Sequence, residues 1–142
     1  MNAHRETSNA DTVGALYRAF GTGDIAFILD QLADDVSWDA DWAGNSAQQA
    51  GVPHLQPRRG PAEVAEFFAL LAEWKFNEFS VLEVIGDGRK VVAEVRSDVV
   101  LPGDHRIADE ELHLWTFDDT GRVSAFRHYG DTAKHITAIA NG

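Results

Sequence analysis

Two histidines and a glutamate stand in the last third of the chain in a pattern suited to proton transfer. His113 follows Glu111 by two residues in a run of β-branched and aromatic residues, and His128 lies in a second such run. An Asp/Thr/Gly turn at 118–121 joins the two runs, which predicts a β-hairpin. A carboxylate can orient an imidazole, and imidazoles titrate near pH 6.5, so the set predicts general acid–base chemistry.

The register of this hairpin decides whether these groups meet. A turn over 118–121 places His113 opposite Phe126 and Glu111 opposite His128. Side chains alternate along strands, so all four then share one face. A bulged three-residue turn would shift the parity and separate them. The predicted site therefore depends on one register.

Helical spacing of apolar residues predicts three helices in the first half of the chain. Ser8 caps the first, which ends at 21–23; Asp24 caps the second, which ends at 34–35; the third begins at Gly60–Pro61. Between the last two, Val36–Trp42 alternates as a short strand. The stretch 43–59 is small and polar, and it is either a binding loop, in which His54 would close the mouth, or disordered.

After residue 75 the apolar period changes to two. Runs at 76–85, 90–101, 106–117 and 122–129 are joined by short turns, which predicts an antiparallel meander. Asp131 can cap a closing helix. Helices followed by such a sheet predict an α+β fold, and the length predicts a single domain over 1–142.

Composition narrows the classes of partner and chemistry. The 142 residues carry a net charge of −11, which disfavours nucleic acid and anionic membranes as partners. The absence of cysteine excludes disulfides and thiolate chemistry. The polar N-terminus and the lack of a long apolar run predict a cytoplasmic protein without a signal peptide or membrane span.

Several segments carry a resemblance to a known superfamily over nearly the whole chain. They are 16–24 (LYRAFGTGD), 32–38 (LADDVSW), 59–61 (RGP), 113–117 (HLWTF), 121–123 (GRV) and 129–133 (YGDTA). The chain resembles the nuclear transport factor 2-like superfamily, and most closely its SnoaL-like polyketide cyclases, which are related to ketosteroid isomerase. The resemblance implies a cone-shaped, strongly curved, mostly antiparallel sheet wrapped around three N-terminal helices, a cystatin-like α+β barrel. It also implies an apolar cavity for a hydrophobic small molecule and a homodimer through the outer sheet face.

Aligned on ketosteroid isomerase, the chain departs from the catalytic pattern. His113 falls where that enzyme has a protonated aspartate, while Leu16 and Ala40 fall where it has its donor tyrosine and its general base. Asp39 and Asp41 flank Ala40, and alternation points both away from its face, so surface acids are the expected reading. Ketosteroid isomerase activity itself is therefore not expected.

The SnoaL-like cyclases supply a different candidate. Asp131 matches the position of their acid–base aspartate, although a helix N-cap explains it equally well. His113 either lines the cavity or lies on a surface, and Glu111 either orients a histidine or is solvated. The predicted catalytic set is His113, Asp131, His128 and Glu111.

Aromatic residues are candidates both for the core and for the wall of a pocket. The predicted substrate-binding set is Trp38, Tyr17, Phe20, Asp41, Phe68, Trp115 and Phe126. No HExxH or His-x-x-x-His spacing occurs, so neither a metal nor another cofactor is expected. The sequence predicts an acid–base cyclase, isomerase or dehydratase acting on a polyketide-, terpenoid- or steroid-like ring. The alternatives are a non-enzymatic binding domain and a structural dimer with a filled cavity.

Overall fold

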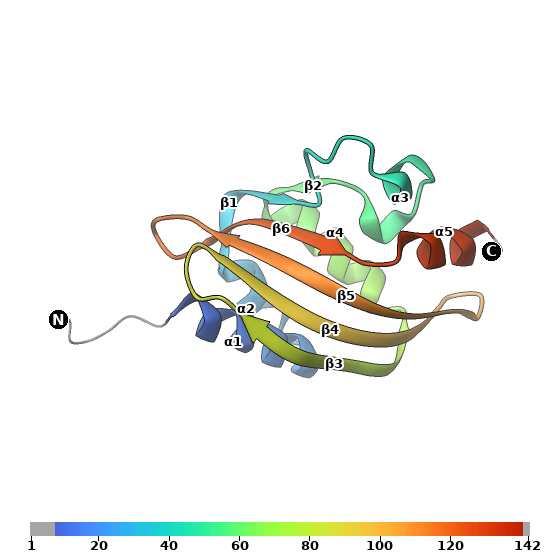
Figure 1. Cartoon of the computed structure of the whole chain (residues 1–142), viewed down its shortest axis with the longest axis horizontal. Helices are drawn as coiled ribbons and strands as arrows, with labels where there is room; N and C mark the ends of the chain where they lie inside the picture. The colour runs from blue at the N-terminus through green and yellow to red at the C-terminus, as the bar shows by residue number, and fades with distance from the viewer. Residues whose placement is uncertain (1–7, 141–142) are drawn as a thin grey trace.

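The computed structural model describes residues 8–140 as one curled, unclosed sheet with helices against its inner face (Figure 1). The strands run in the order β2-β1-β6-β5-β4-β3. Their bounds are β1 Leu32–Trp38, β2 Arg58–Arg59, β3 Lys75–Ile85, β4 Lys90–Leu101, β5 His105–Phe117 and β6 Val123–Tyr129. The helices are α1 Asn9–Thr22, α2 Ile25–Asp30, α3 Ser46–Gln49, the 3₁₀ turn η1 Pro53–Leu55, α4 Gly60–Leu71 and α5 Thr132–Ala140. The predicted α+β fold is confirmed.

Local signals set the ends of the first helices. The Ser8 side chain accepts the Asp11 N–H at the start of α1, and Gly23 ends it in the left-handed conformation (φ 76°). Asp24 then caps α2 by accepting the Phe27 N–H. None of the helices within residues 8–140 is long and apolar enough to cross a membrane.

The first strand begins and ends earlier than the alternation predicted. Helix α2 ends at Asp30 and β1 already starts at Leu32, so the prediction that the helix ends at 34–35 is wrong. The strand predicted over Val36–Trp42 is confirmed over residues 36–38 only. Asp39 and Asp41 have φ angles of 53° and 55°, which break the extended conformation after Trp38. The boundaries follow from pairing with β2 and, in parallel, with β6, and no local pattern reveals such long-range pairing.

The stretch 43–59 is ordered, which decides between the two predictions for it. It forms α3, η1 and β2, and Ala47, Val52 and Leu55 pack in a small core against Ile136 and Ile139 of α5. Apolar packing against α5 therefore orders this stretch at one end of the sheet (Figure 1).

The β5–β6 hairpin keeps the predicted face but not the predicted register. His113 pairs with His128 and Trp115 with Phe126, so the strands are shifted by two residues from the predicted pairing. The Asp118 carboxylate accepts backbone N–H groups as far along as residue 122, which makes the turn longer, and a bulge follows between the 117 and 116 pairs. Each irregularity shifts the register by one residue. Together they restore the parity that places both histidines on the inner face.

Aromatic side chains fill the space between the sheet and the helices. Trp38 is 1% exposed; its ring stacks on Phe126 at 4.0 Å between centroids and meets Trp115 edge-on. Phe67 and Phe68 of α4 cover its other side. Trp38 therefore joins β1, β6, β5 and α4.

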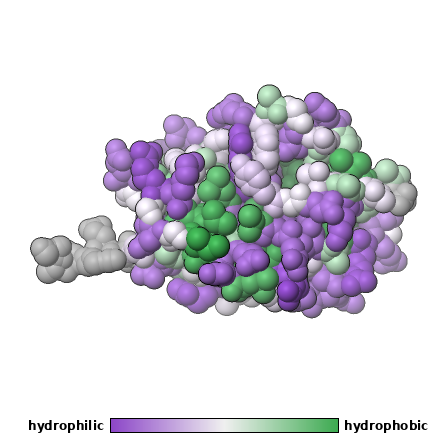
Figure 2. Space-filling view, in the orientation of Figure 1, coloured by the Kyte–Doolittle hydropathy of each residue, from purple (hydrophilic) through white to green (hydrophobic). Residues whose placement is uncertain are grey.

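The outer face of the sheet is partly apolar. Ile85 and Leu112 are 49% and 46% exposed, and Tyr129 is 40% exposed. Figure 2 shows apolar residues gathered in a patch over the strands of this face.

Replacing Trp38 by alanine should lower the free energy of unfolding by about 3–5 kcal/mol, because it leaves a cavity among four elements. Urea denaturation followed by circular dichroism measures this loss. Trp42→Ala, at a half-buried tryptophan after β1, is the control and should cost clearly less. Equal losses would contradict a central packing role for Trp38.

Candidate active site

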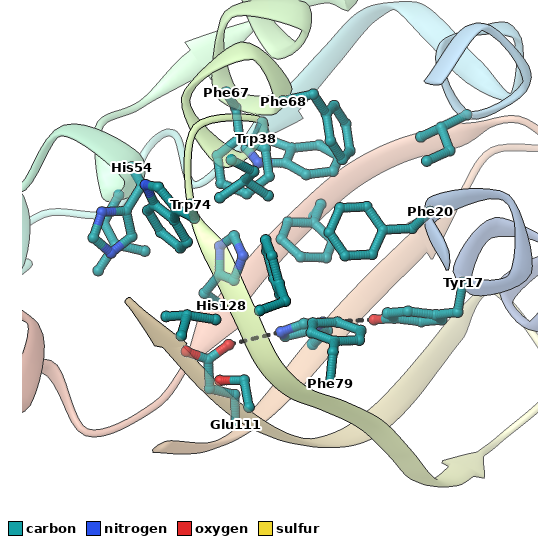
Figure 3. Close-up of a pocket in the computed structure, with 18 of the residues that line it drawn as sticks. Tyr17, Phe20, Trp38, His54, Phe67, Phe68, Trp74, Phe79, Glu111 and His128 are labelled. Carbon is teal, nitrogen blue, oxygen red and sulfur yellow. Dashed lines mark hydrogen bonds and ion pairs between the residues drawn. The ribbon is translucent and has the colours of Figure 1, made fainter. Parts of the chain in front are cut away.

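A cavity of about 90 Å³ lies between the inner sheet face and helices α1 and α4 (Figure 3). Its walls are mainly aromatic, including Phe20, Phe68 and Phe79. Six side chains that can exchange protons also line it: Tyr17, His54, Glu111, His113, His128 and His135. They come from α1, η1, β5, β6 and α5, so the whole fold is needed to assemble them.

Asp39 and His128 form a buried pair on one side of the cavity. The Asp39 carboxylate accepts the His128 backbone N–H at 2.8 Å and lies 2.7 Å from its Nδ1. Asp39 is 1% exposed, and its own N–H donates to the Phe126 carbonyl. Its left-handed backbone turns the side chain inward, which corrects the expectation that it is a surface acid. The pair leaves Nε2 of His128 as the ring nitrogen available to a ligand.

A second group of side chains lies beside this pair. The Tyr17 hydroxyl lies 2.5 Å from His113 Nδ1, and His113 Nε2 lies 2.8 Å from Glu111 Oε1. The Trp115 indole N–H donates to the Tyr17 oxygen at 3.1 Å. Figure 3 shows the line from Glu111 through the histidine to Tyr17. The His113 and His128 rings meet edge to face, with centroids 5.0 Å apart.

A third histidine joins the far side of Glu111. His135 Nε2 lies 2.9 Å from Asp109 Oδ2 and 3.3 Å from Glu111 Oε2. Its Nδ1 lies 2.9 Å from His54 Nε2. A continuous series of side-chain contacts thus runs from His54 through His135, Glu111 and His113 to Tyr17.

Burial and neighbouring charges move the pKa values of these groups in different directions. Burial would lower the pKa of His128, but the Asp39 carboxylate outweighs it and raises the value. Burial lowers the pKa of His113, against the opposing hydrogen bond to Glu111. Burial raises the pKa of Tyr17 far above its ordinary value, so the phenol keeps its proton.

The two histidines at the α5 end of this series of contacts, His135 and His54, have pKa values shifted in opposite directions. Burial opposes the charge on His135, but Asp109 and Glu111 raise its pKa to about 9. Burial and the charge of His135 lower the pKa of His54 to about 3. Burial opposes ionisation of Glu111, but the hydrogen bonds from His113 and His135 hold its pKa well below the ordinary value.

One placement of protons satisfies each of the side-chain hydrogen bonds between Tyr17 and His54 and leaves the contact of His135 with Glu111 as an ion pair. Tyr17 donates to His113 Nδ1, and His113 Nε2–H donates to Glu111. His135 donates through Nε2 to Asp109 and through Nδ1 to His54. His113 is then neutral, with its proton on Nε2.

The structure brings most of the predicted site residues together. His113, His128, Glu111 and the aromatic set Trp38, Tyr17, Phe20, Phe68, Trp115 and Phe126 all line the cavity. Asp131 and Asp41 do not. Asp131 is exposed at the start of α5, and Asp41 is exposed and paired with Arg59 at 2.5 Å. Asp41 points outward because the left-handed residues after β1 end the alternation.

Sequence reasoning missed Asp39, Asp109 and His135 as site residues. Asp109 continues the alternation of Glu111 and His113 along β5, so the strand pattern contained that signal. His135 lies next to Ile136 on a helix whose docking against η1 the sequence does not show.

In wild type, His128 should titrate above the ordinary imidazole value of 6.5, and Asp39→Asn should lower its pKa because burial is left without the opposing charge. NMR titration of the imidazole resonances measures both. Asp35→Asn, at an exposed carboxylate on β1, should leave the His128 value unchanged.

The same pair makes stability depend on pH. Because the pKa of His128 is higher in the folded than in the unfolded chain, its protonation adds to the free energy of unfolding. This contribution is complete below about pH 6.5 and is lost as the pH rises through the folded-state pKa. Asp39→Asn should therefore flatten the unfolding free energy across that range in urea titrations at several pH values. An unchanged slope would contradict the pairing.

Comparison with known proteins places this geometry in a family. No curated protein matches the sequence. An NTF2-like protein of unknown function from Burkholderia pseudomallei is 26% identical, with 92% of this chain and 96% of that chain covered and a TM-score of 0.73. TerC, co-crystallised with polyporic acid, is 24% identical over 93% of this chain and 98% of its own, with a TM-score of 0.72.

A steroid delta-isomerase from Pseudomonas aeruginosa has the same fold. It is 20% identical, with 96% of this chain and 88% of that chain covered and a TM-score of 0.67. The family model of the SnoaL-like domain matches residues 13–126 of this chain. The chain therefore belongs to the SnoaL-like family of NTF2-like proteins.

Proposed function

We propose that this protein is an acid–base enzyme that isomerises, cyclises or dehydrates an apolar, oxygenated small molecule. The observation that carries the proposal is the buried Asp39–His128 pair, which faces a second polar group, Tyr17 and His113, inside an aromatic cavity. A base and a hydrogen-bond donor on neighbouring walls are what proton abstraction next to a carbonyl requires.

His128 is the base in this proposal. Asp39 holds its Nδ1–H, which fixes the tautomer and directs the lone pair of Nε2 at the ligand. The carboxylate also stabilises the imidazolium that forms when the proton is taken up. Because Asp39 is bound to both the backbone and the ring of His128, the base cannot turn away from the cavity.

Tyr17 stabilises the oxygen that becomes negative by turning its hydroxyl proton from His113 Nδ1 to that oxygen. The Trp115 indole N–H keeps donating to the Tyr17 oxygen, which supports the phenol as a donor in a cavity wall where water does not compete. In the reaction, the C–H bond breaks, its proton goes to His128 Nε2, and its electron pair forms an enolate. Returning the proton at another carbon isomerises the substrate, attack of the enolate on a second carbonyl cyclises it, and loss of a β-hydroxyl as water dehydrates it.

The cavity limits the size of ligand that enters without rearrangement. Its volume of about 90 Å³ is below the ~150 Å³ that holds benzene in an engineered cavity and the ~300–1,000 Å³ usual for ligand pockets. Phe76 lines the cavity and is 36% exposed, so it marks the mouth, where Trp74 packs against it. A polyketide-, terpenoid- or steroid-like ring would enter by displacing these side chains. The relatives crystallised with polyporic acid or described as a steroid delta-isomerase support a ligand of this class.

Wild-type protein should accelerate deuterium incorporation next to the carbonyl of at least one apolar cyclic ketone in D₂O. Asp39→Asn and His128→Gln should each reduce this exchange at least about tenfold, since a positioned base contributes ~10²–10⁴ in rate. Mass spectrometry of the recovered ketone measures the label, and Asp35→Asn is the matched control at full rate.

The same experiment separates the enzyme from a binding domain. Imidazole resonances of His128 and His113 report whether each ketone enters the cavity. Ketones that shift these resonances but are recovered without label would contradict catalysis and support the binding domain.

We further propose that the outer sheet face pairs with a second copy of the chain. The exposed apolar side chains of Ile85, Leu112 and Tyr129 on this face support the proposal, since such patches commonly mark association sites. Light scattering after size-exclusion chromatography should then give a dimer mass for wild type and a monomer mass for Leu112→Glu. Ala133→Glu, exposed on α5, should remain dimeric. A monomeric wild type would contradict the proposal.

A further inference from the structure

Two carboxylates and an imidazole converge at the end of the cavity nearest α5. Asp109, Glu111 and His135 each offer one donor atom, and these atoms lie within 4.8 Å of one another. His135 Nε2 is 2.9 Å from the Asp109 oxygen and 3.3 Å from the Glu111 oxygen. Ligands of a tetrahedral zinc ion with bonds of ~2.0–2.2 Å are separated by roughly 3.3 Å, so small shifts would allow all three to bind one ion.

Each of these side chains also has a hydrogen-bond partner outside the cluster. His54 contacts Nδ1 of His135, and His113 contacts the other oxygen of Glu111. The Asp131 N–H lies 3.4 Å from Oδ1 and 3.2 Å from Oδ2 of the Asp109 carboxylate, which accepts from it. Metal ligands in proteins are typically oriented by such outer hydrogen bonds, because these fix the direction of the coordinating lone pairs.

The backbone after β6 passes unusually close to the two carboxylates. A Cβ added at Gly130 would lie 2.8 Å from Asp109 Oδ2 and 3.0 Å from Glu111 Cγ. A side chain at position 130 would therefore displace both carboxylates. Glycine lets the chain close over the cluster, and this observation is independent of the hydrogen bonds within it.

The charges and the open side of the cluster suit a cation. Two carboxylates face one imidazole, and both Asp109 and His135 are buried. Glu111 and His135 line the cavity. An ion bound there would keep a free coordination position directed into the cavity, as in zinc sites with three protein ligands.

A neighbouring cluster, Glu111 with His113 and His128, is less suitable. It contains a single carboxylate against two imidazoles, whereas the Asp109, Glu111 and His135 cluster has two carboxylates against one. We propose that Asp109, Glu111 and His135 bind one divalent transition-metal ion, of which zinc is the representative. This inference does not depend on the proposed function.

Metal binding at this cluster would be coupled to the release of a proton from His135. In the metal-free chain, the Nε2 proton of His135 occupies the position of the ion, so binding must release it. The mixed imidazole and carboxylate donors favour zinc over magnesium, which prefers an all-oxygen octahedral shell.

Isothermal titration calorimetry of the full chain, freed of metal with EDTA, should show one saturable site for ZnCl₂ at pH 7.5 and none for MgCl₂ at the same concentrations. Asp109→Asn and His135→Gln should each weaken zinc binding at least about tenfold. His105→Gln removes a histidine at the start of β5, outside the cluster, and should bind as wild type does. Absence of saturable zinc binding, or equal affinity in all variants, would overturn the proposal.

NMR of the wild-type chain tests the site without relying on the stability of a variant. Adding ZnCl₂ should shift the His135 Nε2 resonance most, while the His105 resonances stay in place. Larger shifts at His105 would overturn the assignment. Asp39→Asn, which disables the proposed base, should bind zinc with wild-type affinity, so failure of the proposed function and failure of the metal site are distinguishable.

Discussion

The buried carboxylate of Asp39 is the constraint on which the site depends. An ionised carboxylate among aromatic side chains is costly unless strong donors surround it, and here the backbone and ring of His128 supply them. Asp39 also ends the pairing of β1 with β6. Its backbone N–H donates to the Phe126 carbonyl, and its side chain then accepts the His128 backbone N–H. Satisfying one charge therefore joins β1 to β6 and fixes the orientation of a histidine.

Elements with local signals could be predicted from the sequence. The caps at Ser8 and Asp24, the apolar stripe of α4 and the period of the meander all stand in contiguous residues, and the structure confirms them. The inward turn of Asp39 could not be predicted, because alternation assumes an extended backbone and this residue is left-handed. His135 was missed because only the docking of α5 against η1 brings it to the cavity.

The polar groups of the cavity are linked rather than independent. Glu111 accepts from His113 and contacts His135, so a change in charge at α5 is felt at Tyr17 through a single carboxylate. Burial lowers the pKa of His113 against the contact with Glu111, whereas Asp109 and Glu111 together raise the pKa of His135, two contacts away. A ligand that takes a proton from one member would change the preferred proton positions along the whole chain.

The turn between β5 and β6 has a consequence for which insertions the chain can tolerate. Inner positions of these strands carry the histidines, and outer positions carry exposed apolar residues such as Leu112. Adding one residue between 118 and 122 without a compensating bulge would exchange the two faces and turn His128 outward, although no site residue had changed. The length of this exposed segment is therefore constrained as strictly as the identity of the histidines, and it should vary only in steps that preserve parity.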